Sequence, residues 1–121
     1  MPEYKLGAME MRFAELIWFN EPLSSRKLVE LCEKELDWKK STTFTVLKRL
    51  CQRGLFQNDN GTVTSLLSRE EFASRQSEEF VDQSFGGSLP QFLAAFSRRK
   101  KLSDQEIEEL EQLIEAHRNM T

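Results

Sequence analysis

The chain has 121 residues, 39% of them hydrophobic and 31% charged, a balance typical of one folded domain, or a small domain with an appendage, and not of a disordered chain. Its net charge of −3 argues against a general binder of polyanions. No stretch approaches the roughly 20 apolar residues of a membrane span, and no secretion signal is expected. We therefore predict a cytoplasmic protein without membrane insertion.

The first predicted helix ends near the turn Asn20-Glu21-Pro22, because apolar residues recur before it at i, i+4, i+7 and i+8. Ser24 or Ser25 is expected to cap a second helix, and Ser41 a third. In the third helix one side is apolar and is expected to be buried: Thr43, Val46, Leu47 and Leu50.

Two short strand-like runs follow the third helix and flank Asn60-Gly61. Asn and Gly tolerate the positive φ of tight hairpin turns, so this dipeptide predicts a β-hairpin. Three short helices followed by a hairpin is the order of a winged helix-turn-helix domain, here residues 1–67. The alternative fold is a helical bundle with an additional hairpin.

After residue 67 the sequence is predicted to be entirely helical. Capping boxes at Ser68–Glu71 and Ser103–Glu106 each predict a helix start, and Gly86-Gly87 predicts a break after Phe85. A short apolar segment and the basic run 98–101 lie between these helices.

The apolar side chains of residues 68–121 have no element of their own to pack against. We predict that a second copy of the chain covers them, which makes this region a helical dimerisation domain. Packing back onto the first domain is the alternative. The residues expected at the dimer interface are Phe80, Phe85, Leu89, Phe92, Leu93, Phe96, Ile107, Leu110 and Ile114.

Positive charge is concentrated around the third helix. No acidic residue lies between Asp37 and Asp59, although five basic residues do. The exposed face of that helix carries hydroxyl, amide and basic side chains, which suit base edges and phosphates in a DNA major groove. A solvated helix face is the alternative. The predicted contacts to double-stranded DNA are Lys39, Lys40, Ser41, Thr42, Thr45, Lys48, Arg49, Gln52 and Arg53, with Asn60 in the wing.

Four motifs in the right order resemble the penicillinase-repressor family, which includes BlaI, MecI and CopY. The recognition-helix signature T-x-x-T-x-L-x-R-L-x-x-R-G occupies 42–54, and L-x-x-x-E followed by Ile17-Trp18 opens the first helix. Trp38 precedes the third helix as in the family, and L-S-x-x-E-I-x-E-L occupies 102–110. Together these motifs cover nearly the whole chain.

The resemblance implies a homodimeric winged-helix repressor of a palindromic operator that an inducing signal displaces. In the antibiotic-resistance members a membrane sensor triggers proteolysis in the dimerisation region, at a bond preceding a phenylalanine. The corresponding bond here is Ala95-Phe96, where Ala95 replaces the family's usual asparagine. Copper-responsive members carry C-terminal C-x-C motifs, whereas this chain has no cysteine after Cys51, which excludes metal induction of that type. Family members often carry a basic residue at the position of Ser41 and another in the wing.

Neither catalytic nor cofactor-binding nor metal-ligating constellations are expected. Cys32 and Cys51 lie in apolar helical patterns and are expected to be reduced core thiols, and His117 is a solvated helix end. Two other functions are considered beside DNA binding. One is a winged-helix protein-interaction module without DNA binding. The other is a small-molecule sensor with a pocket formed by Phe80, Phe85, Phe92 and Phe96.

Overall fold

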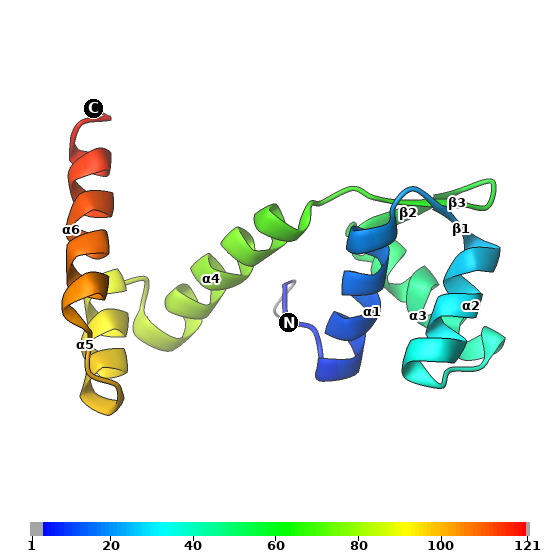
Figure 1. Ribbon diagram of the computed structural model, residues 1–121, viewed down its shortest axis with the longest axis horizontal. Coiled ribbons are helices and arrows are strands. Elements are labelled where there is room, and N and C mark those ends of the chain that lie inside the picture. Colours follow the sequence, from blue (N-terminus) through cyan, green and yellow to red (C-terminus); the bar gives the residue numbers. More distant parts are fainter. Residues whose placement is uncertain (1–3, 121) are drawn as a thin grey trace. The chain divides into compact units, whose positions relative to one another are not determined.

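The computed structural model describes residues 4–120, and the elements in this range are helical apart from three short strands (Figure 1). Two compact units divide the chain between Glu79 and Phe80, so the division falls inside one helix. In chain order the elements are α1 (Ala8–Asn20), β1 (Leu23–Ser24), α2 (Ser25–Leu36), α3 (Lys40–Gln52), β2 (Phe56–Asp59), β3 (Thr62–Ser65), α4 (Arg69–Phe85), α5 (Leu89–Arg99) and α6 (Asp104–Arg118).

The first unit is a winged helix-turn-helix fold, as the sequence predicted. Helices α1, α2 and α3 pack around side chains that are entirely buried, among them Phe13, Leu28 and Leu50. Burying one such side chain contributes roughly 1.5–3 kcal/mol, and this shared core holds α3 in place. The predicted buried face of α3 is confirmed, because Thr43, Val46, Leu47 and Leu50 are all buried.

The N-cap of α3 lies two residues earlier than predicted, so the prediction that Ser41 caps it is wrong. Its N-cap is Lys39, whose side chain makes no capping hydrogen bond, and Ser41 lies in the first turn. The preceding Trp38 explains the shift, because its ring stacks on Phe13 at 5.5 Å and fixes where the chain enters the helix. The N-cap of α2 is Ser24, whose hydroxyl accepts from Lys27 N at 3.0 Å.

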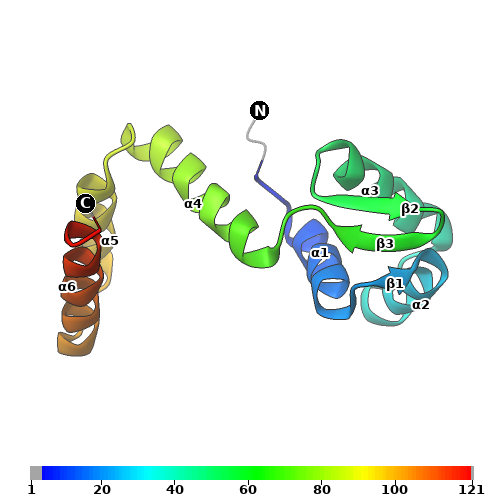
Figure 2. The same cartoon turned by 90° about the horizontal axis from the view of Figure 1, so that it is seen from above.

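The wing is a three-stranded antiparallel sheet with the order β1-β3-β2, so β3 lies in the middle (Figure 2). The predicted hairpin is confirmed, because Asn60 and Gly61 adopt φ of 50° and 90° between β2 and β3. The strand β1 was not predicted, since two residues are too short to show a period. The Glu21 carboxylate ties this sheet to the end of α1, accepting from Ser65 N and Ser65 Oγ at 2.8 Å.

The first unit extends beyond the hairpin into α4. Phe72, on the first turns of α4, is fully buried, and its ring lies 5.5 Å from that of Trp18. The indole of Trp18 also donates to the Leu67 carbonyl at 2.9 Å. At the start of α4 the Ser68 hydroxyl accepts from Glu71 N at 3.0 Å, while the Glu71 carboxylate pairs with Arg75 Nε at 2.9 Å.

The second unit contains the end of α4 with α5 and α6. Gly86 and Gly87, at φ of 57° and 83°, terminate α4 as predicted. The predicted capping box at the start of α6 is confirmed: Ser103 Oγ accepts from Glu106 N, and Glu106 Oε1 accepts from Ser103 N, both at 3.0 Å. These hydrogen bonds lower the pKa of the Glu106 carboxyl.

Apolar side chains of the second unit are left largely exposed. No residue of α5 or α6 is buried, although four phenylalanine rings meet one another with centroids 5.5 to 6.2 Å apart: Phe80, Phe85, Phe92 and Phe96. The exposed fraction is 51% for Phe80 and 63% for Leu89. As a single copy this unit therefore has little buried apolar surface to stabilise it.

Candidate nucleic-acid interface

The exposed face of α3 carries the side chains that the sequence predicted for DNA contact. Ser41, Thr42, Thr45, Lys48 and Gln52 are all exposed, directly opposite the buried face. The Thr45 hydroxyl donates to the Ser41 carbonyl at 2.9 Å, so its proton is engaged within the helix. Its methyl group and its oxygen lone pairs remain available for base edges.

Lys39 and Lys40 lie at the N-terminal end of α3, and both are exposed. Because the side chain of Lys39 makes no capping hydrogen bond, the amides of the first turn are left for water or for an anion, which the helix dipole also favours. A hollow opens beside them between α2 and α3, lined by Lys40 and Phe44 of α3 and by Ser25, Arg26, Val29 and Glu30 of α2. This end of α3 is therefore suited to phosphate oxygens.

Arg49 and Arg53, two other predicted contacts, are engaged with the segment before and at the start of α1. Arg49 Nη2 lies 3.2 Å from Glu10 Oε2, and the Arg49 side chain stays 52% exposed. Arg53 Nη2 donates to the Lys5 carbonyl at 3.1 Å. The sequence did not reveal these contacts, although Glu10 belongs to the opening motif of α1.

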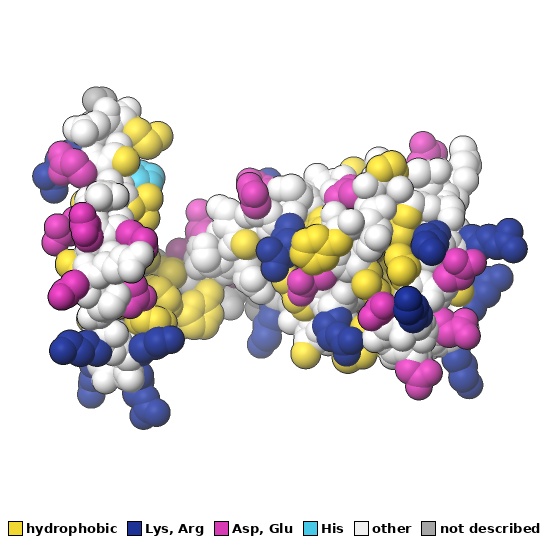
Figure 3. All heavy atoms as spheres, viewed as in Figure 1, with side chains coloured by type: hydrophobic (Ala, Val, Ile, Leu, Met, Phe, Trp, Pro, Cys, Tyr) yellow, Lys and Arg dark blue, Asp and Glu magenta, His cyan; other side chains and the backbone are white. Residues whose placement is uncertain are grey.

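The wing adds amide and hydroxyl groups but no base. Asn60 is exposed in the turn, and next to it Asp59 at the end of β2 pairs with Thr62 at the start of β3. The turn is held by Asn58 Oδ1, which accepts from Gly61 N at 3.0 Å. On the face of the first unit that Figure 3 shows, Lys and Arg side chains stand among acidic ones instead of forming one continuous patch. A wing without basic side chains adds little electrostatic attraction to DNA.

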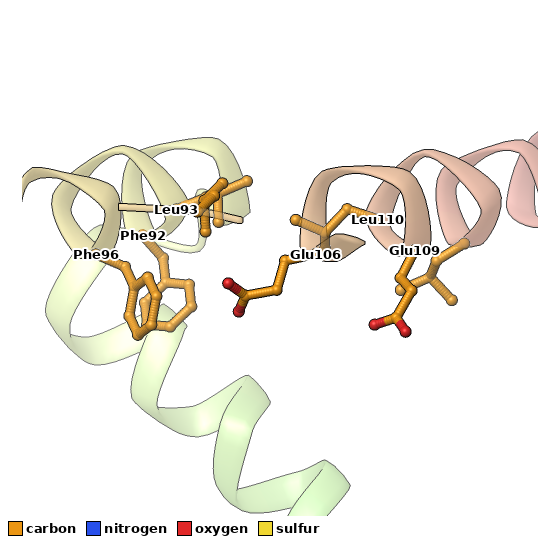
Figure 4. A pocket seen from close by; sticks show the side chains of 8 residues that line it. Phe92, Leu93, Phe96, Glu106, Glu109 and Leu110 are labelled. Carbon is orange, nitrogen blue, oxygen red and sulfur yellow. The ribbon is translucent and has the colours of Figure 1, made fainter. Parts of the chain in front are cut away.

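The predicted dimerisation residues lie in the second unit, and four of them, Phe92, Leu93, Phe96 and Leu110, line a hollow of about 360 Å³ between α5 and α6. Its walls are the α5 side chains Phe92, Leu93 and Phe96 and the α6 side chains Leu110 and Leu113, with two glutamates at the edge. Figure 4 shows the rings of Phe92 and Phe96 next to each other, with the Glu106 carboxylate pointing toward them. An apolar, open surface of this kind is typical of a protein interface.

The Ala95-Phe96 bond lies inside α5, and Phe96 is 42% exposed. The Phe96 carbonyl accepts from Lys100 N at 3.1 Å, so the Ala95-Phe96 peptide bond is part of a hydrogen-bonded helix.

Burial raises the pKa of both thiols, Cys32 and Cys51, and both cysteines are free. A raised pKa keeps a thiol protonated and poorly reactive. Among residues 4–120 no group of acidic, histidine and cysteine side chains is arranged to hold a metal ion, and no helix is long and apolar enough to cross a membrane.

A buried three-helix core, an exposed polar recognition helix and a hairpin wing define a DNA-binding protein of the winged helix-turn-helix class. The model of one family in this class, "Penicillinase repressor", matches residues 6–116, and the chain belongs to that family. It is accordingly a transcriptional repressor and not an enzyme, as predicted.

Two curated relatives align with almost their full length. The chain is 25% identical over 115 residues to the methicillin resistance regulatory protein MecI of Staphylococcus aureus strain Mu50, covering 92% of this chain and 94% of MecI. It is 26% identical over 119 residues to the penicillinase repressor of Bacillus licheniformis, covering 95% of this chain and 93% of that protein. A solved structure of a multiple antibiotic-resistance repressor (MarR) from Listeria monocytogenes has a TM-score of 0.49 at 17% identity and covers 97% of this chain and 76% of its own.

Proposed function

We propose that the protein is a homodimer that represses transcription by placing α3 of each subunit in the major groove of a palindromic operator. The observation that carries this proposal is the division of α3 into two faces. One face is buried in the core, and the other exposes Thr45, Lys48 and Gln52 from a segment without acidic residues.

The exposed side chains of α3 provide several kinds of base contact. Lys48 is a donor for guanine O6 and N7 or for a phosphate, and the Gln52 amide matches the donor and acceptor of adenine. The Thr45 methyl group suits a thymine methyl. Lys39 and Lys40 lie where the phosphate backbone would pass as the N-terminal end of α3 enters the groove.

Dimer formation through residues 68–121 is supported by the exposure of apolar side chains in the second unit. Ile107 and Ile114 on α6 are 40% and 55% exposed, and Leu113 is 57% exposed. Burying such surface is the main favourable term in protein association, and a second copy supplies an identical apolar face. Two-fold symmetry then requires two half-sites separated by a whole number of turns of the DNA double helix. One such turn is about 10 bp.

Release from DNA by a membrane sensor-protease system is the mode of induction that we propose by analogy with the family. Cleavage at Ala95-Phe96 would require local opening of α5, because a bond in a hydrogen-bonded helix does not fit an extended substrate site. The alanine at position 95 makes this bond a poorer match to the family pattern.

Replacing both Thr45 and Lys48 by Ala is expected to weaken binding to the DNA upstream of the protein's own gene by at least about ten-fold. Each good base contact contributes roughly 1–3 kcal/mol, and 1.4 kcal/mol is a factor of ten. Fluorescence anisotropy with a labelled duplex measures the effect.

Lys34→Ala is the matched control, since it removes one positive charge from the exposed end of α2 and should leave the affinity nearly unchanged. Full affinity of the Thr45/Lys48 double variant would contradict the proposed role of α3. If no duplex is bound by the unmodified protein and a stable protein partner is recovered instead, the fold serves as an interaction module.

A further inference from the structure

The carboxylate of Glu10 holds two different parts of the first unit. Glu10 Oε1 accepts from Gly7 N at 3.1 Å at the N-terminal end of α1. Glu10 Oε2 lies 3.2 Å from Arg49 Nη2 on α3. The Glu10 side chain is only 24% exposed, so it has few alternative partners in water. One side chain thus joins the beginning of α1 to the recognition helix.

Both arginines near the C-terminal end of α3 are held by residues in or just before α1. Arg53 donates to the Lys5 carbonyl at 3.1 Å, and Arg49 pairs with Glu10. Lys39, Lys40 and Lys48 differ from them, since none of these lysines has an ion pair with any described residue. The positive charge of α3 is therefore divided between three lysines without such an ion pair and two arginines that are engaged with α1 or the segment before it.

We infer that Glu10 is a positioning residue that keeps the Arg49 guanidinium on α1 and withholds it from the DNA phosphates. The inference rests on the proposed function, and it adds a way in which the protein limits binding to DNA of unrelated sequence. A phosphate contact from Arg49 would strengthen binding to every sequence alike, because backbone contacts carry no sequence information. When Arg49 is held on α1, discrimination between DNA sequences depends on Thr45, Lys48 and Gln52.

Moving Arg49 to a phosphate would also leave the Glu10 carboxylate unpaired beside a polyanion. Repulsion between that carboxylate and the phosphates opposes the exchange. The pair presents a neutral surface to DNA as long as it is intact. This explains how the chain can keep a basic residue at position 49 without a strong general affinity for DNA.

The test is the salt dependence of binding to a labelled 30-bp duplex of mixed sequence. The slope of log K against log salt changes by about −0.9 for each additional phosphate that the protein neutralises. Glu10→Gln keeps an oxygen for Gly7 N but removes the charge that holds Arg49. We expect this variant to bind more tightly, with a slope steeper by about 0.9 per bound subunit. Arg49→Gln should leave the slope of the unmodified protein unchanged.

Glu15→Gln is the matched control, because Glu15 also lies on α1 and pairs with an arginine, Arg69, at 3.6 Å. It makes the same change in net charge and should not alter the slope. Arg49→Lys retains a cation for Glu10 and should also give the unmodified slope, whereas Glu10→Gln combined with Arg49→Gln should lack the steeper slope of Glu10→Gln alone. Melting curves establish that each variant is folded.

Two results would overturn the inference. One is a slope shallower by about 0.9 in Arg49→Gln, which would mean that Arg49 already contacts a phosphate. The other is a folded Glu10→Gln variant with the same slope as Glu15→Gln. Either leaves the proposed function intact, since the unmodified protein still binds DNA. Failure of the unmodified protein to bind any duplex, including the DNA upstream of its own gene, would overturn the proposed function and this inference together.

Discussion

Phe92→Asp is expected to convert the proposed dimer to a monomer and to lower operator affinity by about 10²–10⁴-fold, the range by which joining two binding modules strengthens attachment. The ring of Phe92 meets Phe80, Phe85 and Phe96 and forms part of the hollow between α5 and α6. A carboxylate in the middle of an apolar interface is strongly unfavourable unless it is paired.

Because Phe92 also holds its own unit together, Ile107→Asp provides an independent variant. Ile107 is 40% exposed, so a charge there disturbs a single copy little. Gln112→Asp is the control, since it places the same charge at an exposed position of the same helix, away from Ile107 and Leu110. Light scattering coupled to size exclusion gives the mass directly. If both Phe92→Asp and Ile107→Asp remain dimers, the interface lies elsewhere.

Phe72→Ala is expected to destabilise the first unit by about 3–5 kcal/mol, the usual cost of removing a fully buried phenylalanine. Phe72 has no exposed surface and packs between Tyr4 and Trp18, with ring centroids 6.2 and 5.5 Å away. The loss equals a large part of the stability of an ordinary domain. Guanidinium unfolding followed by the fluorescence of Trp18 and Trp38 measures it.

The control is Phe80→Ala, the same substitution two turns along α4, where the side chain is 51% exposed. It should change the unfolding of the first unit by less than about 1 kcal/mol, as surface substitutions do. Equal effects of the two substitutions would contradict the placement of Phe72 in the core.

The elements that carry local signals could be predicted from the sequence. The buried face of α3, the Asn60-Gly61 turn and the capping box at Ser103 each depend on residues within a few positions of one another. Backbone conformation and helix periodicity are sufficient to determine them.

The features that were missed depend on contacts between distant parts of the chain. Phe72 joins the first core through Trp18, 54 positions earlier, and so the first compact unit extends beyond the boundary predicted at residue 67. Arg49 was assigned to DNA from its place on the exposed face, and only the fold shows Glu10 beside it. No periodicity reveals such pairs, because they are set by how α1 packs against its neighbours.

In the proposed complex, two subunits place two α3 helices in successive major grooves of one operator. Footprinting on the DNA upstream of the protein's own gene, combined with the mass of the complex, tests it most directly. We predict two chains per site and two related half-sites whose centres are about 10 bp or a multiple of it apart, with protection lost in the Thr45/Lys48 double variant. A single unpaired footprint bound by one chain, or protection that survives the double variant, would contradict this arrangement.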